Sequence, residues 1–175
     1  MTVAQIVERV SAFPVAHHVV LTGGEPMIAP EIGGLSRALH ERGLHITIET
    51  AGTVLTDVAC DLMSISPKLA NSTPEGTFRA QHERLRWRPE VIRQLMAAYE
   101  YQLKFVVARE EDLHEVRAMV SELGAPAEKV ILMPEGISAG VLHERSLWVA
   151  EMCKLHGFRF TPRLHVDLYG NRRGV

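Results

Sequence analysis

The sequence predicts an α/β fold in which mostly parallel strands alternate with helices. Short apolar segments typical of strands are followed repeatedly by longer segments whose apolar residues recur at helical spacing. Three of these longer segments run into Gly43, Gly124 or Gly157, and glycine commonly follows the last residue of a helix. Since parallel strands have to be joined by crossovers, helices between the strands favour a parallel sheet, open or closed.

The first predicted element is a short amphipathic helix near the N-terminus, where Val3, Ile6, Val7 and Val10 fall at helical spacing. The predicted strands cover residues 17–21, 44–50, 61–66, 101–107, 129–136 and 158–170. We expect the last strand to bend at Pro162. The predicted helices cover residues 30–43, 88–100, 110–124 and 138–157. The polar segment 71–87 is interpreted either as a loop or lid or as a solvated connection.

Three predicted strands alternate polar and apolar residues. Their polar positions are His45, Thr47 and Glu49; Gln102 and Lys104; and Arg159, Thr161, Arg163, His165, Asp167 and Tyr169. Residues two apart in a strand share a face, so one face of the sheet is expected to be apolar and the other polar. The polar face is either exposed to solvent or lines a partly closed barrel that holds a ligand. Helices between the strands favour the barrel, because right-handed crossovers place them on one side of a curling sheet.

Composition and charge exclude several classes of partner. Hydrophobic residues make up 46% and charged residues 23%, which is typical of one globular domain with a core. A net charge of −2 gives no electrostatic case for nucleic-acid binding, and no apolar run has the length of a membrane span. The N-terminus lacks the pattern of a signal peptide. Cys60 and Cys153 are far apart and form no disulfide framework, so a cytoplasmic location is expected.

Unusual residues gather where predicted strands end, namely at 22–26, 49–53, 66–68 and 134–136. In α/β barrels and doubly wound folds, ligands bind at the carboxyl ends of the strands. In the sequence TGGEP, Gly23 and Gly24 would let the backbone approach a ligand closely. Glu25 would either accept a hydrogen bond from an ammonium group or orient the loop. On its own the stretch favours a tight turn between a strand and a helix. Its position after a strand, together with the other strand-end stretches, favours a binding loop instead.

Five segments, VVLTGGEP, ITIETAGT, SISPKLANSTP, QLKFVV and RLHVDLYGNRRGV, resemble the radical S-adenosylmethionine (SAM) superfamily. More narrowly, they resemble the 7-carboxy-7-deazaguanine synthases of the queuosine pathway, over about Val19 to Val175. GGEP alone fits several radical SAM groups, including the glycyl-radical activating enzymes, whereas ETAGT with SPK and the C-terminal segment is narrower. The resemblance implies an incomplete TIM-like radical SAM barrel, forming one domain over residues 1–175.

The resemblance also implies binding residues. Those implied for SAM are Gly23, Gly24, Glu25, Glu49, Ser66, Pro67, Lys68, Gln102, Leu103, Lys104 and Phe105. Those implied for the substrate are Thr22 and Val175. Arg163 and His165 are expected as further substrate contacts because they share the polar face of the last predicted strand. Glu49 is expected to accept from the ribose hydroxyls and Lys68 to meet the SAM carboxylate. From the residues alone, Glu49 could be a surface acid, Lys68 a solvated lysine and His165 a structural histidine. No residue is assigned as catalytic or as a metal ligand.

The implied reaction is the radical ring contraction of 6-carboxy-5,6,7,8-tetrahydropterin to 7-carboxy-7-deazaguanine, with loss of ammonia. SAM, a [4Fe–4S] cluster and Mg²⁺ are the implied cofactors, and the pterin is the small-molecule partner. The family's three cluster cysteines precede GGEP, yet none of the 18 residues before Val19 is Cys. We therefore expect that the first βα unit is missing and that the chain alone does not cleave SAM. A late start codon, a fragment or a natural truncation would each explain this.

Two other functions stay open. One is a radical-activating enzyme of the glycyl-radical type, whose partner is a large protein. The other is a non-catalytic, truncated SAM-binding or interaction protein, which fits the missing cysteines best. Loss of the first unit would leave the edge of the strand at 17–21 exposed, and a homodimer would cover that edge.

Overall fold

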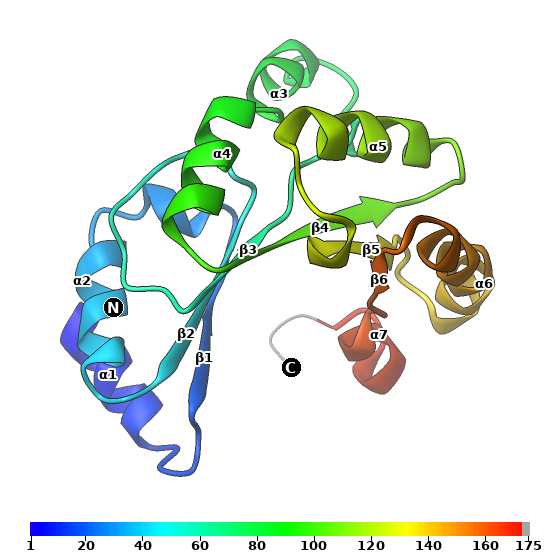
Figure 1. Ribbon diagram of the computed structural model, residues 1–175. Helices are drawn as coiled ribbons and strands as arrows, with labels where there is room; N and C mark the ends of the chain where they lie inside the picture. Colours follow the sequence, from blue (N-terminus) through cyan, green and yellow to red (C-terminus); the bar gives the residue numbers. More distant parts are fainter. Residues whose placement is uncertain (173–175) are drawn as a thin grey trace. The chain divides into compact units, whose positions relative to one another are not determined.

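The computed structural model describes residues 1–172, which form two compact units. Unit 1 combines Met1–Ile65 with Glu90–Tyr101, and unit 2 combines Ser66–Pro89 with the chain from Gln102 onward. Each unit contains three parallel strands that pair in chain order, and helices join consecutive strands except the second and third strands of unit 1 (Figure 1). The predicted α/β class with parallel strands is therefore confirmed. One domain over residues 1–175 stays a prediction.

Unit 1 is built on the strands β1 (His18–Leu21), β2 (His45–Thr50) and β3 (Leu62–Ile65). Its helical elements are α1 (Val3–Ser11), η1 (Pro26–Ile28), α2 (Ile32–His40) and α4 (Pro89–Ala98). The helix α1 begins with a capping box, in which Thr2 and Gln5 satisfy each other's backbone N–H groups. Figure 1 shows α1 and α2 beside β1 and β2, and α2 packs against β2.

The core of unit 1 follows the predicted alternation along β2. Ile46 and Ile48 are completely buried and Thr50 is nearly so, whereas the residues between them are half-buried. Burial of each apolar side chain contributes on the order of 1.5–3 kcal/mol. The alternation therefore fixes which face of β2 points to the core, and with it the direction of Glu49 on the other face.

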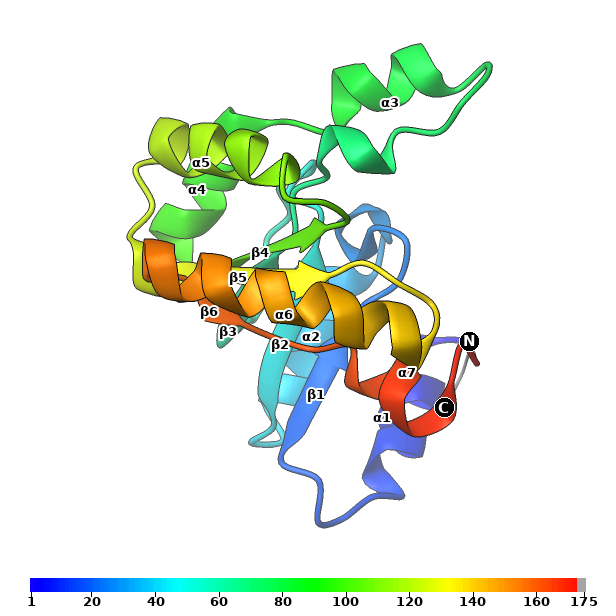
Figure 2. The same ribbon diagram turned by 90° about the vertical axis from the view of Figure 1, so that its right-hand side faces the viewer.

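Unit 2 is built on β4 (Tyr101–Val107), β5 (Val130–Pro134) and β6 (Arg159–Phe160). Its helical elements are η2 (Ala70–Ser72), α3 (Arg79–Leu85), α5 (Asp112–Leu123), η3 (Ala127–Lys129), α6 (Ala139–His156) and α7 (Leu164–Tyr169). Figure 2 shows α6 running along β5, against which it packs. Gly124 and Gly157 take left-handed conformations, with φ of 66° and 69°, directly after α5 and α6. Both predicted helix ends are confirmed.

The predicted strand 158–170 is wrong beyond Phe160. β6 contains only Arg159 and Phe160, and α7 begins two residues after Pro162. Pro162 has no N–H to donate to a sheet, and the chain turns there instead of bending within a strand. The polar residues from Arg163 to Tyr169 therefore do not share one strand face. Arg163 lies at the N-terminal boundary of α7 and His165 lies exposed inside that helix.

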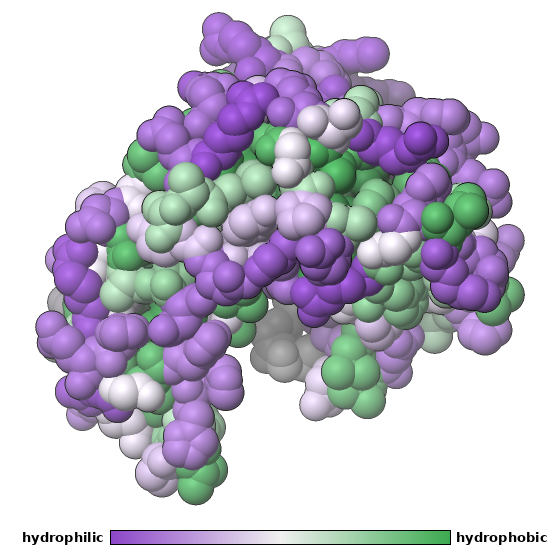
Figure 3. Space-filling view, viewed as in Figure 1, coloured by the Kyte–Doolittle hydropathy of each residue, from purple (hydrophilic) through white to green (hydrophobic). Residues whose placement is uncertain are grey.

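The segment 71–87 is more regular than the sequence indicates, because it contains α3. Six of the seven residues of α3 are exposed, and Figure 3 shows that the surface around this helix is mainly hydrophilic. No apolar stripe marks the helix, which explains why hydrophobic spacing does not reveal it. Its position depends on polar contacts, which are described below.

The strands do not close into a barrel within residues 1–172. There, β1 pairs only with β2, and β6 pairs only with β5. This agrees with the predicted incomplete barrel. Within the described part of the chain, no helix is long and apolar enough to cross a membrane.

Candidate functional site

The loop after β1 exposes its backbone. Gly23 has a φ of 156°, a conformation that residues with side chains rarely adopt. A Cβ placed on Gly23 or on Gly24 would have no atom within 4 Å. There is therefore open space beside the backbone of these two residues, as close approach of a ligand requires.

Glu25 fastens this loop to the segment that follows β2. Its Oε1 accepts hydrogen bonds from the Thr50 hydroxyl at 2.8 Å and the Met27 N–H at 3.2 Å. Its Oε2 accepts from the Ala51 N–H at 2.9 Å and the Thr53 hydroxyl at 3.4 Å. A carboxylate can accept about four hydrogen bonds, and these four donors come from the protein itself. Of the two roles expected for Glu25, orienting the loop is the one that these contacts fit.

Glu49 lies beside the same loop. The Thr22 hydroxyl donates to its Oε2 at 3.2 Å, which joins the loop after β1 to the polar face of β2. The Glu49 side chain is half-buried. The structure thus brings Thr22 and Glu49 together, two residues implied separately for the substrate and for SAM.

The segment after β2 has little freedom to move. Gly52 has a φ of 72°, and a Cβ there would lie 2.7 Å from Ile92 Cγ1 and 2.9 Å from Ile65 Cγ2. Further along, the Thr56 hydroxyl donates to the Met27 carbonyl at 2.8 Å. A close-packed glycine and a hydroxyl contact therefore fix a stretch that has no regular secondary structure.

Unit 2 contains a cavity of about 470 Å³ at the carboxyl ends of its strands. It is lined by Ser66, Pro67, Lys68, Leu69, Asn71, Ser72, Val106, Ala108, Met133, Glu135 and Arg163. Ser66, Pro67 and Lys68 were implied for SAM and Arg163 for the substrate, so the structure places these four around one cavity. Its size is within the range of small-molecule sites.

The segment 102–105, which was implied for SAM, has two side chains that face the core and two that do not. Leu103 and Phe105 are completely buried in the core of unit 2, whereas Gln102 and Lys104 are half-buried. The two apolar side chains therefore pack in the core. Of Leu103 and Phe105, only the backbone groups could therefore contact a ligand.

Arg86 joins the cavity wall at Lys68 to Glu115 of α5. Its guanidinium donates to the Lys68 carbonyl at 3.0 Å, to Glu115 at 2.6 Å and to Glu83 at 2.7 Å. Its side chain is only 14% exposed. Burial lowers the pKa of Arg86, but hydrogen bonds to Glu83 and Glu115 outweigh burial, so the pKa is raised overall. Arg86 is therefore charged at any physiological pH.

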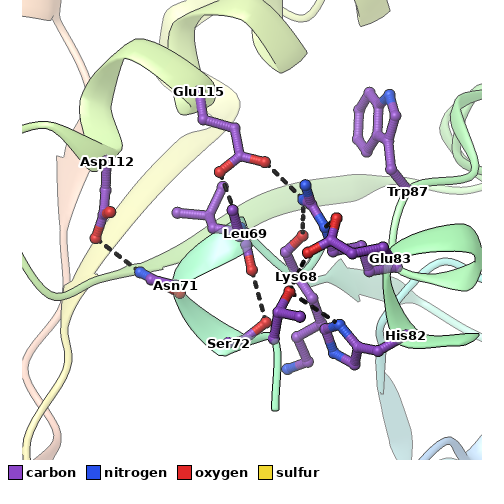
Figure 4. Close-up of polar contacts among 12 residues, drawn as sticks. Lys68, Leu69, Asn71, Ser72, His82, Glu83, Trp87, Asp112 and Glu115 are labelled. Atoms are coloured by element: carbon purple, nitrogen blue, oxygen red, sulfur yellow. Dashed lines mark hydrogen bonds and ion pairs between the residues drawn. The ribbon is translucent and has the colours of Figure 1, made fainter. Parts of the chain in front are cut away.

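Asn71 and Ala70 make the next contacts along the wall. The Asn71 amide donates to Asp112 at 2.7 Å and to the Val106 carbonyl at 3.1 Å, and the Ala70 N–H donates to Glu115 at 2.9 Å. Asp112 and Glu115 both lie in the first turn of α5 (Figure 4). The first turn of one helix thus positions several residues of the cavity wall.

The segment 73–83 is joined to the same network through Glu83. The Thr73 hydroxyl donates to Glu83, and this hydrogen bond, followed by the one from Arg86, lowers the pKa of the Glu83 carboxyl. His82 Nδ1 also lies 3.3 Å from the Thr73 hydroxyl. These contacts fix α3 without an apolar face.

The two cysteines do not fit an iron–sulfur cluster. Cys60 lies in unit 1 and contacts the Ile46 carbonyl, and Cys153 lies in unit 2 and donates to the Arg159 carbonyl. Burial raises the pKa of both thiols, whereas cluster ligands are thiolates. Two protonated thiols cannot supply the three thiolates that the family resemblance implies.

One predicted residue, His165, lies apart from these arrangements. His165 is exposed in α7 and is not among the residues that line the cavity of unit 2. Val175 lies outside the described residues.

Sequence reasoning missed Asn71 and Asp112, and it included Thr50 and Glu135 only within the strand-end stretches 49–53 and 134–136. Thr50 lies within ETAGT, and a hydroxyl residue at a strand end was its only signal. Asn71 and Asp112 are 41 residues apart, and their contact has no local signature.

Comparison with known proteins gives a consistent result. The family model of the radical SAM superfamily matches residues 1–123. The chain is 38% identical to the 7-carboxy-7-deazaguanine synthase of Halobacterium salinarum, over 98% of this chain and 72% of that protein. It is 41% identical to the synthase of the same name from Rhodopirellula baltica, over 90% of this chain and 63% of that protein.

A solved structure agrees in fold. The crystal structure of QueE from Escherichia coli matches 93% of this chain and 64% of that one, with a TM-score of 0.59 and 22% sequence identity. The chain thus spans from 63% to 72% of the length of these relatives.

Proposed function

The chain belongs to the radical SAM superfamily and, within it, to the 7-carboxy-7-deazaguanine synthases, and on this premise we propose that it binds SAM and a carboxylated pterin. The proposed reaction is the ring contraction of 6-carboxy-5,6,7,8-tetrahydropterin to 7-carboxy-7-deazaguanine with loss of ammonia. The observation that carries the proposal is the loop after β1, with its open glycine backbone between Glu25 and the Thr22–Glu49 pair.

Each group in unit 1 has a distinct part in the proposal. Glu49 accepts from the two ribose hydroxyls of SAM, since a carboxylate offers two oxygens to a vicinal diol. Gly23 and Gly24 offer backbone groups at close range. Glu25 orients the loop through its four hydrogen bonds. Thr22, already bonded to Glu49, is the proposed substrate contact on this side.

In unit 2, the cavity takes polar parts of the ligands. Lys68 is proposed to meet the SAM carboxylate as a point charge. Ser66 and Pro67 shape the wall beside it. Gln102 and Lys104, with the backbone of Leu103 and Phe105, are the remaining proposed SAM contacts. Bound SAM, together with a reduced [4Fe–4S] cluster, supplies the radical chemistry in this superfamily. Because Cys60 and Cys153 do not fit that cluster, the radical step is not assigned to residues of this chain.

Four further points are part of the proposal, namely the substrate, the location, the homodimer and Mg²⁺. The substrate is the pterin and the location is the cytoplasm. The protein acts as a homodimer that covers the edge of β1. Mg²⁺ is expected as a second cofactor of the reaction, although no ligand for it is assigned among residues 1–175.

Calorimetric titration with S-adenosylhomocysteine, which the protein cannot cleave, tests the SAM assignment. Glu49→Gln should weaken binding by about tenfold, because it replaces one accepting oxygen by an NH₂ group. The loss should vanish for the 2′-deoxyribose analogue, which has no diol. Glu31→Gln, an exposed acid in unit 1 whose side chain caps no helix, is the matched control. Equal affinity of Glu49→Gln and the wild-type protein would contradict the assignment.

Pterin binding separates the proposal from its alternatives. A deazaguanine synthase should quench the fluorescence of 6-carboxypterin on binding, whereas a radical-activating enzyme should not bind it. A SAM-binding protein without catalytic function should bind S-adenosylhomocysteine alone. Relatives that are 38% and 41% identical carry the name of the synthase, which favours the first outcome.

Anaerobic reconstitution with iron and sulfide tests the expectation that this chain alone does not cleave SAM. We expect no stable cluster, because both thiols are protonated and buried or half-buried. A stable cluster that cleaves SAM would overturn this expectation.

A further inference from the structure

Arg163 lines the cavity of unit 2, and its Nε is buried without a hydrogen-bond partner among the described residues. A buried N–H without an acceptor costs free energy, and native structures satisfy most such groups. An unpaired donor at the wall of a cavity is therefore a place where an acceptor on a ligand would be stabilised.

The rest of the Arg163 guanidinium is held in place. Its Nη1 donates to the Gly136 carbonyl at 2.9 Å. Its own carbonyl accepts from the Val166 N–H at 2.9 Å, within the turn that starts α7. Val166 is buried, so the backbone at Arg163 is anchored as well. With Nη1 engaged, the opposite edge of the guanidinium, formed by Nε and Nη2, is the edge that includes the unpaired donor.

The charges around the cavity favour an anion. Lys68 and Arg163 supply two positive charges to its lining. Glu135 supplies a negative one, but Arg145 forms an ion pair with Glu135 and also donates to its carbonyl at 2.6 Å. Glu135 is the one acidic residue among the described residues that line the cavity, so its ion pair leaves no uncompensated negative charge in that lining.

We propose that Arg163 binds a ligand carboxylate side-on, with Nε and Nη2 each donating to one carboxylate oxygen. The fixed fork of a guanidinium matches the two oxygens of a carboxylate. The inference rests on the proposed function, because both proposed ligands bear a carboxylate, SAM on its methionine part and the pterin on its ring. It goes further by naming the chemical group that Arg163 recognises and the edge that recognises it.

Two ligand pairs, in each of which only one member bears a carboxylate, test the proposal and identify the source of the carboxylate. S-adenosylhomocysteine is compared with 5′-methylthioadenosine, which lacks the amino-acid part, and 6-carboxypterin is compared with pterin. Affinities are measured for the whole chain and for Arg163→Gln. The variant should lose about tenfold or more of its affinity for the carboxylate-bearing member of one pair, and none for its partner. The pair that responds shows whether the carboxylate belongs to SAM or to the pterin.

Two further variants distinguish recognition of the carboxylate from effects of charge and of folding. Arg163→Lys retains the charge but not the fork, so it should not restore the affinity. Arg159→Gln is the matched control, because Arg159 is exposed in β6 and does not line the cavity. It should bind all four ligands like the wild-type protein. Circular dichroism and the melting temperature show whether each variant is folded.

The other outcomes are also distinct. If Arg163→Gln weakens both members of a pair equally, or neither, the carboxylate proposal is wrong while the proposed function stands. Full recovery of affinity in Arg163→Lys would overturn the side-on fork. If the wild-type protein binds none of the four ligands, the proposed function itself fails.

Discussion

Two hydrogen-bond networks fix the candidate binding loops, and their central groups have opposite charge. In unit 1, one carboxylate, Glu25, collects four uncharged donors from the loop after β1 and the segment after β2. In unit 2, the guanidinium of Arg86 joins two carboxylates and the backbone of the cavity wall. The first network lies between short, closely packed loops, whereas the second holds a longer segment with an exposed helix.

The difference shows how each loop resists motion. Around Glu25, hydrogen bonds are backed by tight packing at Gly52, so shape and polarity act together. Around Arg86, charge-assisted hydrogen bonds replace an apolar face that α3 lacks. We therefore expect the loops of unit 1 to respond to changes in volume, and the segment 68–87 to respond to salt and pH.

The largest effect is expected for Gly52→Ala in unit 1. An added Cβ would lie 2.7 Å from Ile92 at a φ of 72°, and overpacking together with backbone strain costs about 2–4 kcal/mol. Gly76→Ala in unit 2 is the matched control, since Gly76 has a φ of 86° but open space around its Cβ position. Urea unfolding should show a clearly smaller loss in the free energy of unfolding for Gly76→Ala than for Gly52→Ala. Equal losses would show that the packing around Gly52 adds nothing to the backbone strain.

Glu25→Gln comes next. Its NH₂ group would face donors instead of accepting from them, which leaves partly buried N–H or O–H groups unsatisfied at a cost of about 2–3 kcal/mol. Hydrogen exchange should accelerate in residues 22–28 and 49–53. The exposed Glu31→Gln should change the free energy of unfolding by less than about 0.5 kcal/mol. Unchanged exchange in Glu25→Gln would show that packing alone fixes the loop.

Arg86→Gln should loosen unit 2 more mildly. Glu115 and Glu83 are partly exposed and can regain water, so the expected loss is about 1–2 kcal/mol, confined to residues 68–87. Hydrogen exchange of that segment is the measurement, and Arg84→Gln on exposed α3 is the control. One molar salt should reduce the difference between wild-type protein and Arg86→Gln, because charge pairs near the surface are screened. A salt-independent difference would argue against a charge-based network.

The smallest effect concerns the pH dependence carried by Glu83. Hydrogen bonds from Thr73 and Arg86 lower the pKa of Glu83, so its stabilising effect is present above the ordinary carboxyl value of 4.5 and is lost as the pH falls through the lowered pKa. Arg86 stays charged throughout, since its pKa is raised. Exchange rates of residues 73–86, measured between pH 3 and 6, should converge for wild-type protein and Glu83→Gln at the acidic end. A gap that widens on acidification would reverse the sign and refute this assignment.

Much of the fold could be predicted because its signals are local. The alternation along β2 and β4 and the glycines that follow α5 and α6 depend on residues adjacent in the chain. The last strand was mispredicted because polar and apolar residues alternate through a segment in which Pro162 ends the strand. Alternation alone does not distinguish that segment from the start of a helix.

The candidate site was predictable in its residue types and less so in its connections. TGGEP and ETAGT indicated the loops, but the sequence did not indicate that Glu25 accepts hydrogen bonds from Thr50 and Ala51. Arg86 reaches Glu115 across 29 residues, and no local pattern encodes such a pair. Arg163 was singled out for a strand face that does not exist, and it lines the cavity from the start of α7 instead.

Hydrogen exchange with and without S-adenosylhomocysteine tests the central claim most directly, namely that the strand-end loops bind SAM. Exchange should slow in residues 22–28, 49–53 and 66–72, and it should stay unchanged in the exposed helix α3. Binding of S-adenosylhomocysteine without slowed exchange in residues 22–28 and 49–53 would contradict the claim.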